Sequence, residues 1–119
     1  MKPLTNITNF LDRFDNFIDA EIKELIVLSA SMIKVVLLAQ DRSREFDWIK
    51  IELNFVDIFD AKLIEDKKLS LIDMSDGISI IKDGTKIAFA IGKYNNIQTI
   101  KNSIIYIESK TIKYDERSF

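Results

Sequence analysis

The side chains that could do chemistry in this chain are carboxylates, lysines, tyrosines and hydroxyls, because its 119 residues contain no histidine and no cysteine. The commonest general base, the usual zinc ligands and a thiol nucleophile are therefore excluded, and so is a Ser-His-Asp triad. The glycines at 77, 84 and 92 match neither a phosphate loop nor a dinucleotide fingerprint. We expect a protein that is not an enzyme and that uses no cofactor.

Two spacings among the remaining reactive side chains invite a chemical interpretation. Ser31 and Lys34 could form a hydroxyl–lysine dyad, but a catalytic lysine must be buried to lose its proton. Asp12, Asp15 and Asp19 lie three and four residues apart and could share a calcium or magnesium ion, although a calcium loop offers six or more oxygens around a glycine turn. A turn serine and a solvated helix face are the preferred interpretations, so no metal site is predicted.

The C-terminal part of the chain carries a thin version of the basic stripe with aromatics that nucleic-acid binding uses. Its residues are Lys101, Lys110, Lys113, Arg117, Tyr106 and Tyr114. Residues 77–119 have a net charge of +3 and residues 1–76 one of −5, so the whole chain is slightly acidic. A basic edge strand that resists unwanted pairing is the preferred interpretation, and no nucleic-acid partner is predicted.

These side chains must be positioned by one helix followed by strands. Apolar residues at spacings of three and four predict an amphipathic helix that begins after Thr5 or Asn6 as the cap and ends near Asp19. Its stripe consists of Ile7, Phe10, Leu11, Phe14, Phe17 and Ile18. The three phenylalanines are expected to be buried against a sheet, since an apolar stripe needs a partner surface.

After the helix the apolar period becomes two, which indicates strands. Residues 21–29 and 32–40 flank a turn at 29–31 and are apolar in both alternating sets, which is typical of central strands. The next strand contains residues 49–55, with 56–60 as a continuation. A further short strand is predicted to open at 69–72.

The C-terminal half predicts a hairpin and a long final strand. Asp83-Gly84 supplies the turn between strands at 78–81 and 87–91. Ala88 and Ala90 leave room for the helix to approach. The final strand runs from about 103 to 114, with a bulge near 108–110. Together these elements predict a single α+β domain over 1–119, mostly antiparallel sheet with the N-terminal helix packed on it.

Trp48 lies in the polar phase of its strand, together with Lys50 and Glu52. An aromatic ring among charges resembles an interface centre with a polar rim, and tryptophan is enriched among interface residues that dominate binding. The alternative is that the helix covers this face and Trp48 belongs to the core. We predict Trp48, Lys50 and Glu52 as partner-binding residues, for another protein or for a second copy in a homodimer.

Three segments, FIDAEI at 17–22, IELNFVDIF at 51–59 and SIIYIESK at 103–110, resemble a loose group of small bacterial domains that open with a Phe-His-Asp-Ala-type motif. Some members of that group are similar to immunity proteins, which neutralise toxins of rival bacteria. In this chain Ile18 stands where the group has histidine, so only Asp19 keeps its place in the motif. The resemblance implies a protein that inhibits a toxin by binding it.

The N-terminal residues lack the apolar segment of a signal peptide, and no apolar run is long enough to span a bilayer. We therefore expect a cytoplasmic protein without membrane contact, and the lack of cysteine fits a reducing compartment. The leading hypothesis is a non-enzymatic interaction module of a bacterial cytoplasm, of the immunity type. The alternatives are a homo-oligomeric structural module and an enzyme that uses carboxylate chemistry.

Overall fold

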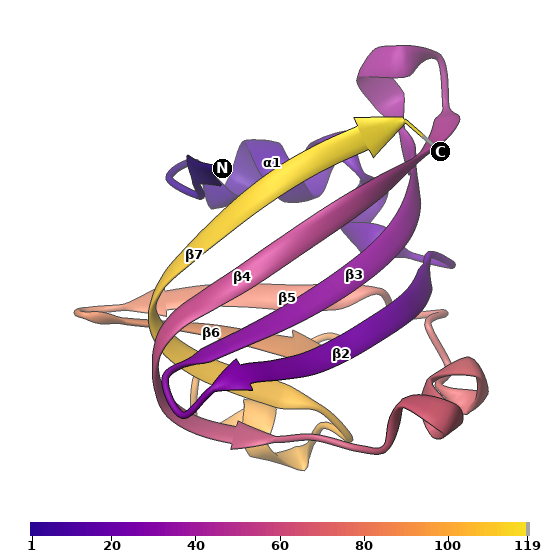
Figure 1. Cartoon of the computed structure of the whole chain (residues 1–119). Helices are drawn as coiled ribbons and strands as arrows, with labels where there is room; N and C mark the ends of the chain where they lie inside the picture. The colour runs from indigo at the N-terminus through magenta and orange to yellow at the C-terminus, as the bar shows by residue number, and fades with distance from the viewer. Residues whose placement is uncertain (119) are drawn as a thin grey trace.

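The computed structural model describes residues 1–118, and its main feature is one strongly bent antiparallel sheet (Figure 1). The strands are β1 (Lys2–Pro3), β2 (Glu21–Ser29), β3 (Met32–Asp41), β4 (Asp47–Lys62), β5 (Ile78–Asp83), β6 (Lys86–Ile91) and β7 (Tyr106–Ser118). The other elements are the helix α1 (Ile7–Arg13) and the short turns η1 (Asp15–Phe17), η2 (Arg42–Arg44), η3 (Asp66–Leu71) and η4 (Thr99–Asn102). The predicted α+β fold is confirmed.

The strand order is β2-β3-β4-β7-β6-β5, so the last strand of the chain lies in the middle of the sheet. β1 pairs with the side of β7 that faces away from β4, with Lys2 opposite Tyr114. In Figure 1, β2, β3, β4 and β7 run diagonally across the front, and the β5–β6 hairpin crosses behind them. β2 and β5 are the two edges, and the core lies between the front strands and the hairpin.

The core is built from the inward set of each alternating strand. On β4 this set is Ile49, Ile51, Leu53 and Phe55, which are all buried, as their alternation predicts. Phe55 meets Phe89 of β6 with ring centroids 5.2 Å apart, which joins the front strands to the hairpin behind. Each such side chain contributes about 1.5–3 kcal/mol through removal of apolar surface from water.

The helix α1 closes one end of the bent sheet and lies behind the upper ends of β7 and β4 in Figure 1. The side chain of Asn6 accepts a hydrogen bond from the backbone N–H of Asn9 at 3.0 Å, so the predicted cap is confirmed. Phe10, Phe14 and Phe17 are buried and their ring centroids lie 5.1 to 5.7 Å apart. Within residues 1–118 no helix has the length and apolar character needed to cross a membrane.

The helix ends at Arg13, and the prediction that it extends to about Asp19 is wrong. Asp15, Asn16 and Phe17 have φ values of 53°, 55° and 58°, so η1 is a left-handed turn that no right-handed helix can continue through. This turn keeps the ring of Phe17 in the core while it redirects the chain into β2. The apolar spacing of the sequence therefore persists after the helix itself has stopped.

Two strand predictions also need correction. β2 is an edge strand and not a central one, because only β3 pairs with it along residues 21–29. Residues 69–72 do not open a strand. Leu69 belongs to the turn η3, and its side chain is buried in the core. The predicted strands at 32–40 and 49–60 are both present, and the latter is longer than expected.

The C-terminal half differs from expectation in four details. The final strand, predicted at about 103–114, is β7 at Tyr106–Ser118. Asp83 pairs with Lys86, so the two loop residues are Gly84 and Thr85, one position later than predicted. Ala88 and Ala90 pack against Ile100 and Tyr106 rather than against the helix. The bulge opposite residues 108–109 places its extra residue, Phe59, on β4 and not on β7.

Candidate interaction site

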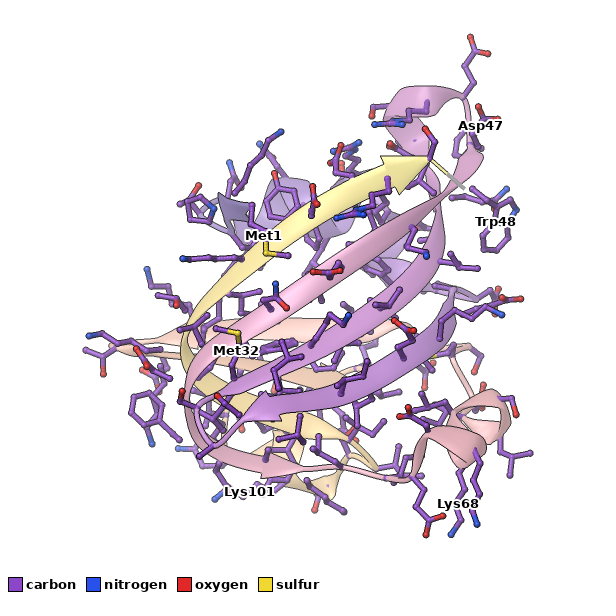
Figure 2. All side chains as sticks on the ribbon, in the orientation of Figure 1. Met1, Met32, Asp47, Trp48, Lys68 and Lys101 are labelled. Carbon is purple, nitrogen blue, oxygen red and sulfur yellow. The ribbon has the colours of Figure 1, made fainter. Side chains whose placement is uncertain are left out.

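Trp48 lies at the beginning of β4, and its side chain projects away from the ribbon (Figure 2). It pairs across the sheet with Gln40 of β3, while Lys50 and Glu52 follow on the same outer face of β4. The side chain of Trp48 is 42% exposed, so this ring is not part of the core. The three residues predicted to bind a partner therefore share one face of the sheet.

Two further large apolar side chains are exposed beside Trp48. Phe46 is 56% exposed and Ile18 is 39% exposed, and both line, with Trp48, a hollow of about 140 Å³. We call this feature the aromatic hollow, defined by Ile18, Phe46 and Trp48. Lys50 and Glu52 do not line it. The sequence prediction thus found one of its three apolar residues.

The aromatic hollow is held by backbone in the left-handed region. Phe46 and the residue before it, Glu45, have φ values of 66° and 57°, and Asp19, next to Ile18, has 60°. Non-glycine residues pay for such conformations in strain, so the surrounding contacts must fix them. The N–H of Phe46 donates to the carbonyl of Asp41 at 2.9 Å, and the N–H of Asp19 donates to that of Met74 at 2.9 Å. Both rims of the hollow are therefore preorganised.

A network of charges adjoins the hollow and joins four elements, which are α1, β3, β7 and η2. Nε and Nη2 of Arg13 donate to the two carboxylate oxygens of Asp41 at 2.8 and 2.6 Å. The same guanidinium bonds Glu116 of β7, and Arg44 of η2 contacts Asp41 at 3.2 Å. The carboxylate of Asp41 has no exposed surface. The bidentate geometry fixes the position of α1 relative to the ends of β3 and β7.

The network shifts the pKa values of both Asp41 and Arg13. The hydrogen bond from Arg13, aided by those from Ser43, lowers the pKa of Asp41 to about 2 against the opposing effect of burial. The carboxylates of Asp41 and Glu116 in turn raise the pKa of Arg13 above its ordinary value. Asp41 and Arg13 are therefore both charged at neutral pH, and their ion pair joins α1 to β3.

The three aspartates considered as metal ligands do not converge. Asp12 and Asp15 lie 3.5 and 4.0 Å from Arg42, so a guanidinium occupies the position that a cation would take. Asp19 lines the aromatic hollow on one side and a groove beside η3 on the other. Across residues 1–118 no three or more carboxylates are arranged to hold a metal ion.

The Ser31–Lys34 dyad is not formed either. The hydroxyl of Ser31 lies 3.3 Å from that of Ser29 in the exposed turn of the β2–β3 hairpin. Lys34 points to the outer face of β3, opposite Asn54 of β4. The structure therefore places these two residues in the positions that their structural interpretation predicts.

The two tyrosines near the C-terminus are engaged in contacts within the protein. The ring of Tyr114 packs on Phe10 with centroids 5.1 Å apart, and the hydroxyl of Tyr106 donates to Asp60 at 2.8 Å. This hydrogen bond and burial raise the pKa of Tyr106. Lys101 lies 3.7 Å from the same carboxylate of Asp60. Neither tyrosine presents its ring beside the lysines as a stacking surface for bases.

No protein-family model matches this chain, and neither the curated proteins nor the solved structures contain a match to it. The resemblance to the group with the Phe-His-Asp-Ala-type motif accordingly stays a prediction that rests on the three quoted segments. The site is defined by geometry alone: an exposed apolar cluster, a small hollow and a rim of charges.

Proposed function

We propose that this protein is a non-enzymatic interaction module that binds a protein partner through the aromatic hollow. The observation that supports this function best is the exposure of Ile18, Phe46 and Trp48 around one hollow on rigid backbone. A group of large apolar side chains that is exposed in the isolated protein is typical of a surface that another molecule covers. Arg42, Asp15 and Asp19 supply the polar rim that surrounds such an interface centre.

The hollow suits insertion of one apolar side chain from the partner. A volume of about 140 Å³ lies well below the pockets of roughly 300–1,000 Å³ that hold small-molecule substrates. Trp48 and Phe46 would flank the inserted group, since aromatic residues provide large contact areas at low entropic cost. Lys50 and Glu52 extend the contact along β4.

The test uses Trp48 as its own probe, because it is the only tryptophan in the chain. Free protein should emit at long wavelength and be quenched by acrylamide, and a captured partner should shift the emission to the blue. Measured by titration calorimetry, which needs no fluorophore, Trp48→Ala and Phe46→Ala should each weaken that partner's binding by about fivefold or more. Phe59→Ala removes an equally exposed ring elsewhere on β4 and should leave the affinity unchanged. Equal effects from all three variants would refute the assignment.

The finer proposal is that the partner is a toxin of a rival bacterium, as the resemblance of residues 17–22, 51–59 and 103–110 implies. In this case the gene beside that of the present protein should encode a toxin domain, and the purified toxin should lose activity on binding. A neighbouring metabolic gene and a toxin that is unaffected would contradict this partner class while leaving the interaction site open to another protein.

A second copy of the chain is the alternative occupant of the aromatic hollow. A homodimer would bury Trp48 and Phe46 in the absence of any other protein, and light scattering would report twice the monomer mass. Trp48→Ala should then restore the monomer. This outcome would favour the homo-oligomeric structural module over an inhibitor of a foreign protein.

A further inference from the structure

The edge of β2 is an open hydrogen-bonding surface. β2 pairs with β3 on one side only, and within residues 1–118 no backbone hydrogen bond joins residues 21–29 to any segment other than β3. The chain that leaves β4 runs beneath this edge towards η3 without pairing with it (Figure 1). Residues 63–75 flank this edge and η3 packs close to β2, so an added strand has to fit between β2 and that segment.

Two grooves lie along the open edge. The first is shallow and apolar, with a volume of about 520 Å³, and is lined mainly by Leu25, Ile26 and Val27 of β2 and by Leu63 and Ile64. We call it the apolar groove. Val27 and the adjacent Leu28 are among the exposed large apolar residues of the molecule. The apolar groove therefore flanks the C-terminal half of β2.

The second groove, of about 500 Å³, flanks the N-terminal half of β2 and faces η3. We call it the acidic groove. The two grooves together are lined by five carboxylates and one ammonium group, which are Asp19, Glu21, Glu65, Asp66, Asp73 and Lys23. Lys23 pairs with Glu21 at 2.9 Å, and Lys67 of η3 pairs with Glu65 at 3.2 Å. The edge is therefore acidic mainly through Asp19, Asp66 and Asp73.

This charge decides between possible occupants. A second copy paired through β2 would bring two acidic surfaces together, which like-charge repulsion opposes. A foreign strand that carries lysine or arginine at one end and apolar residues at the other matches both grooves.

We propose that the edge of β2 binds an extended segment of another protein as an added strand, antiparallel to β2, apolar in its N-terminal half and basic in its C-terminal half. Every strand pair of this sheet is antiparallel, and the same orientation on β2 places the N-terminal half of the added strand over the apolar groove. Backbone hydrogen bonds would give affinity and the two grooves specificity. This inference rests on the proposed function as a protein-binding module but uses a different surface.

The test uses synthetic peptides with the intact protein. A labelled peptide TVTVTKTKT should bind about tenfold more tightly than its reverse, TKTKTVTVT, and TVTVTETET should not bind measurably in fluorescence anisotropy. Two further peptides carry N-methyl groups on the odd-numbered or on the even-numbered backbone nitrogens. One of them should not bind and the other should bind normally, because only one of these two sets of N–H groups faces β2. Equal affinity of the forward and reversed peptides, or normal binding of both N-methylated peptides, would overturn the proposal.

Variants separate this edge from the aromatic hollow. Glu21→Gln with Asp66→Asn should weaken TVTVTKTKT by about tenfold and flatten its salt dependence. The matched control, Asp83→Asn with Asp115→Asn, removes two charges from β5 and β7 and should leave the affinity for TVTVTKTKT unchanged. Trp48→Ala should retain full peptide affinity. The proposal for the aromatic hollow and the proposal for the edge of β2 can therefore be refuted separately. A dimer that Val27→Lys converts to monomer would show a second copy on β2 and overturn the proposal.

Discussion

At the end of β3, Asp41 keeps a negative charge with no exposed surface, and Arg13 from the helix neutralises it. Removal of the guanidinium would leave that buried carboxylate with Arg44 and Ser43 only. Arg13→Ala should lower the free energy of unfolding by about 2–4 kcal/mol in urea denaturation. Arg42→Ala removes an exposed arginine from the same region and should cost only about 0–1 kcal/mol. Equal costs for the two variants would contradict a structural role for the network.

The same residue predicts a pH dependence of stability. The pKa of Asp41 is lowered to about 2 in the folded protein from its ordinary value of 3.8. A lowered folded-state pKa gives stability that is fully present above the unfolded value and is lost as pH falls through the folded value. The melting-temperature difference between the parent and Asp41→Asn should therefore be constant above about pH 5 and shrink between about pH 4 and pH 2. A difference that grows on acidification would contradict the assignment.

Among the elements, the left-handed turn η1 depends on a glycine from another part of the chain. Gly77 has a φ of +69°, and a Cβ placed there would lie 2.1 Å from the carbonyl oxygen of Asn16. Gly77→Ala should therefore cost roughly 3 kcal/mol or more, since both the backbone angle and the clash oppose it. Gly84→Ala has a similar φ of +61° with nothing within 4 Å and should cost only about 1–2 kcal/mol. Thermal melts of the two variants compare these costs directly.

The helix α1 is predicted to act as a structural lid. Phe14 is buried and packs against both Phe10 and Phe17, and the guanidinium of Arg13 lies 4.8 Å from its ring centroid. Phe14→Ala should lower the free energy of unfolding by about 3–5 kcal/mol through loss of packing. A variant that melts within a degree or two of the parent would show instead that the stripe is free to contact a partner.

The elements were predictable where local sequence and tertiary structure agree. Alternation identifies β3 and β4, the cap at Asn6 identifies the beginning of α1, and Gly84 marks the hairpin within one residue. The end of α1 was not predictable, because Phe17 keeps the helical spacing although its backbone is left-handed. The edge position of β2 was missed because Val27 and Leu28 are exposed, although their apolar character suggests a covering layer.

The candidate site was only partly predictable for a related reason. The phase of Trp48 within its strand indicates an outward ring, and the structure agrees. Phe46 and Ile18 join it because left-handed residues at 45–46, at 15–17 and at 19 redirect two loops towards one another. One usable signal was present, since Phe46 is an aromatic residue directly after the charged segment 41–45 and beside Trp48. Nothing in the local sequence brings Ile18 to the same place.

At the scale of the whole molecule, the sheet is joined by contacts between distant parts of the chain. β4 at residues 47–62 pairs with β7 at residues 106–118, and neither can complete its pairing locally. Such topologies fold slowly because loop closure precedes the gain from long-range pairing. Refolding from urea should take about milliseconds to seconds when followed by Trp48 fluorescence in stopped flow. Relaxation in microseconds would contradict the importance of the β4–β7 pairing.

The central place of β7 has a consequence for synthesis on the ribosome. β7 emerges after all other strands, yet it separates β4 from β6 in the finished sheet. Until it arrives, the nascent chain holds a three-stranded meander and a separate hairpin, each with an unpaired edge. Translation proceeds at about 5–20 residues per second, which leaves these edges open to chaperones or to neighbouring nascent chains for a second or more. The step that completes the domain is therefore coupled to the delivery of its last strand.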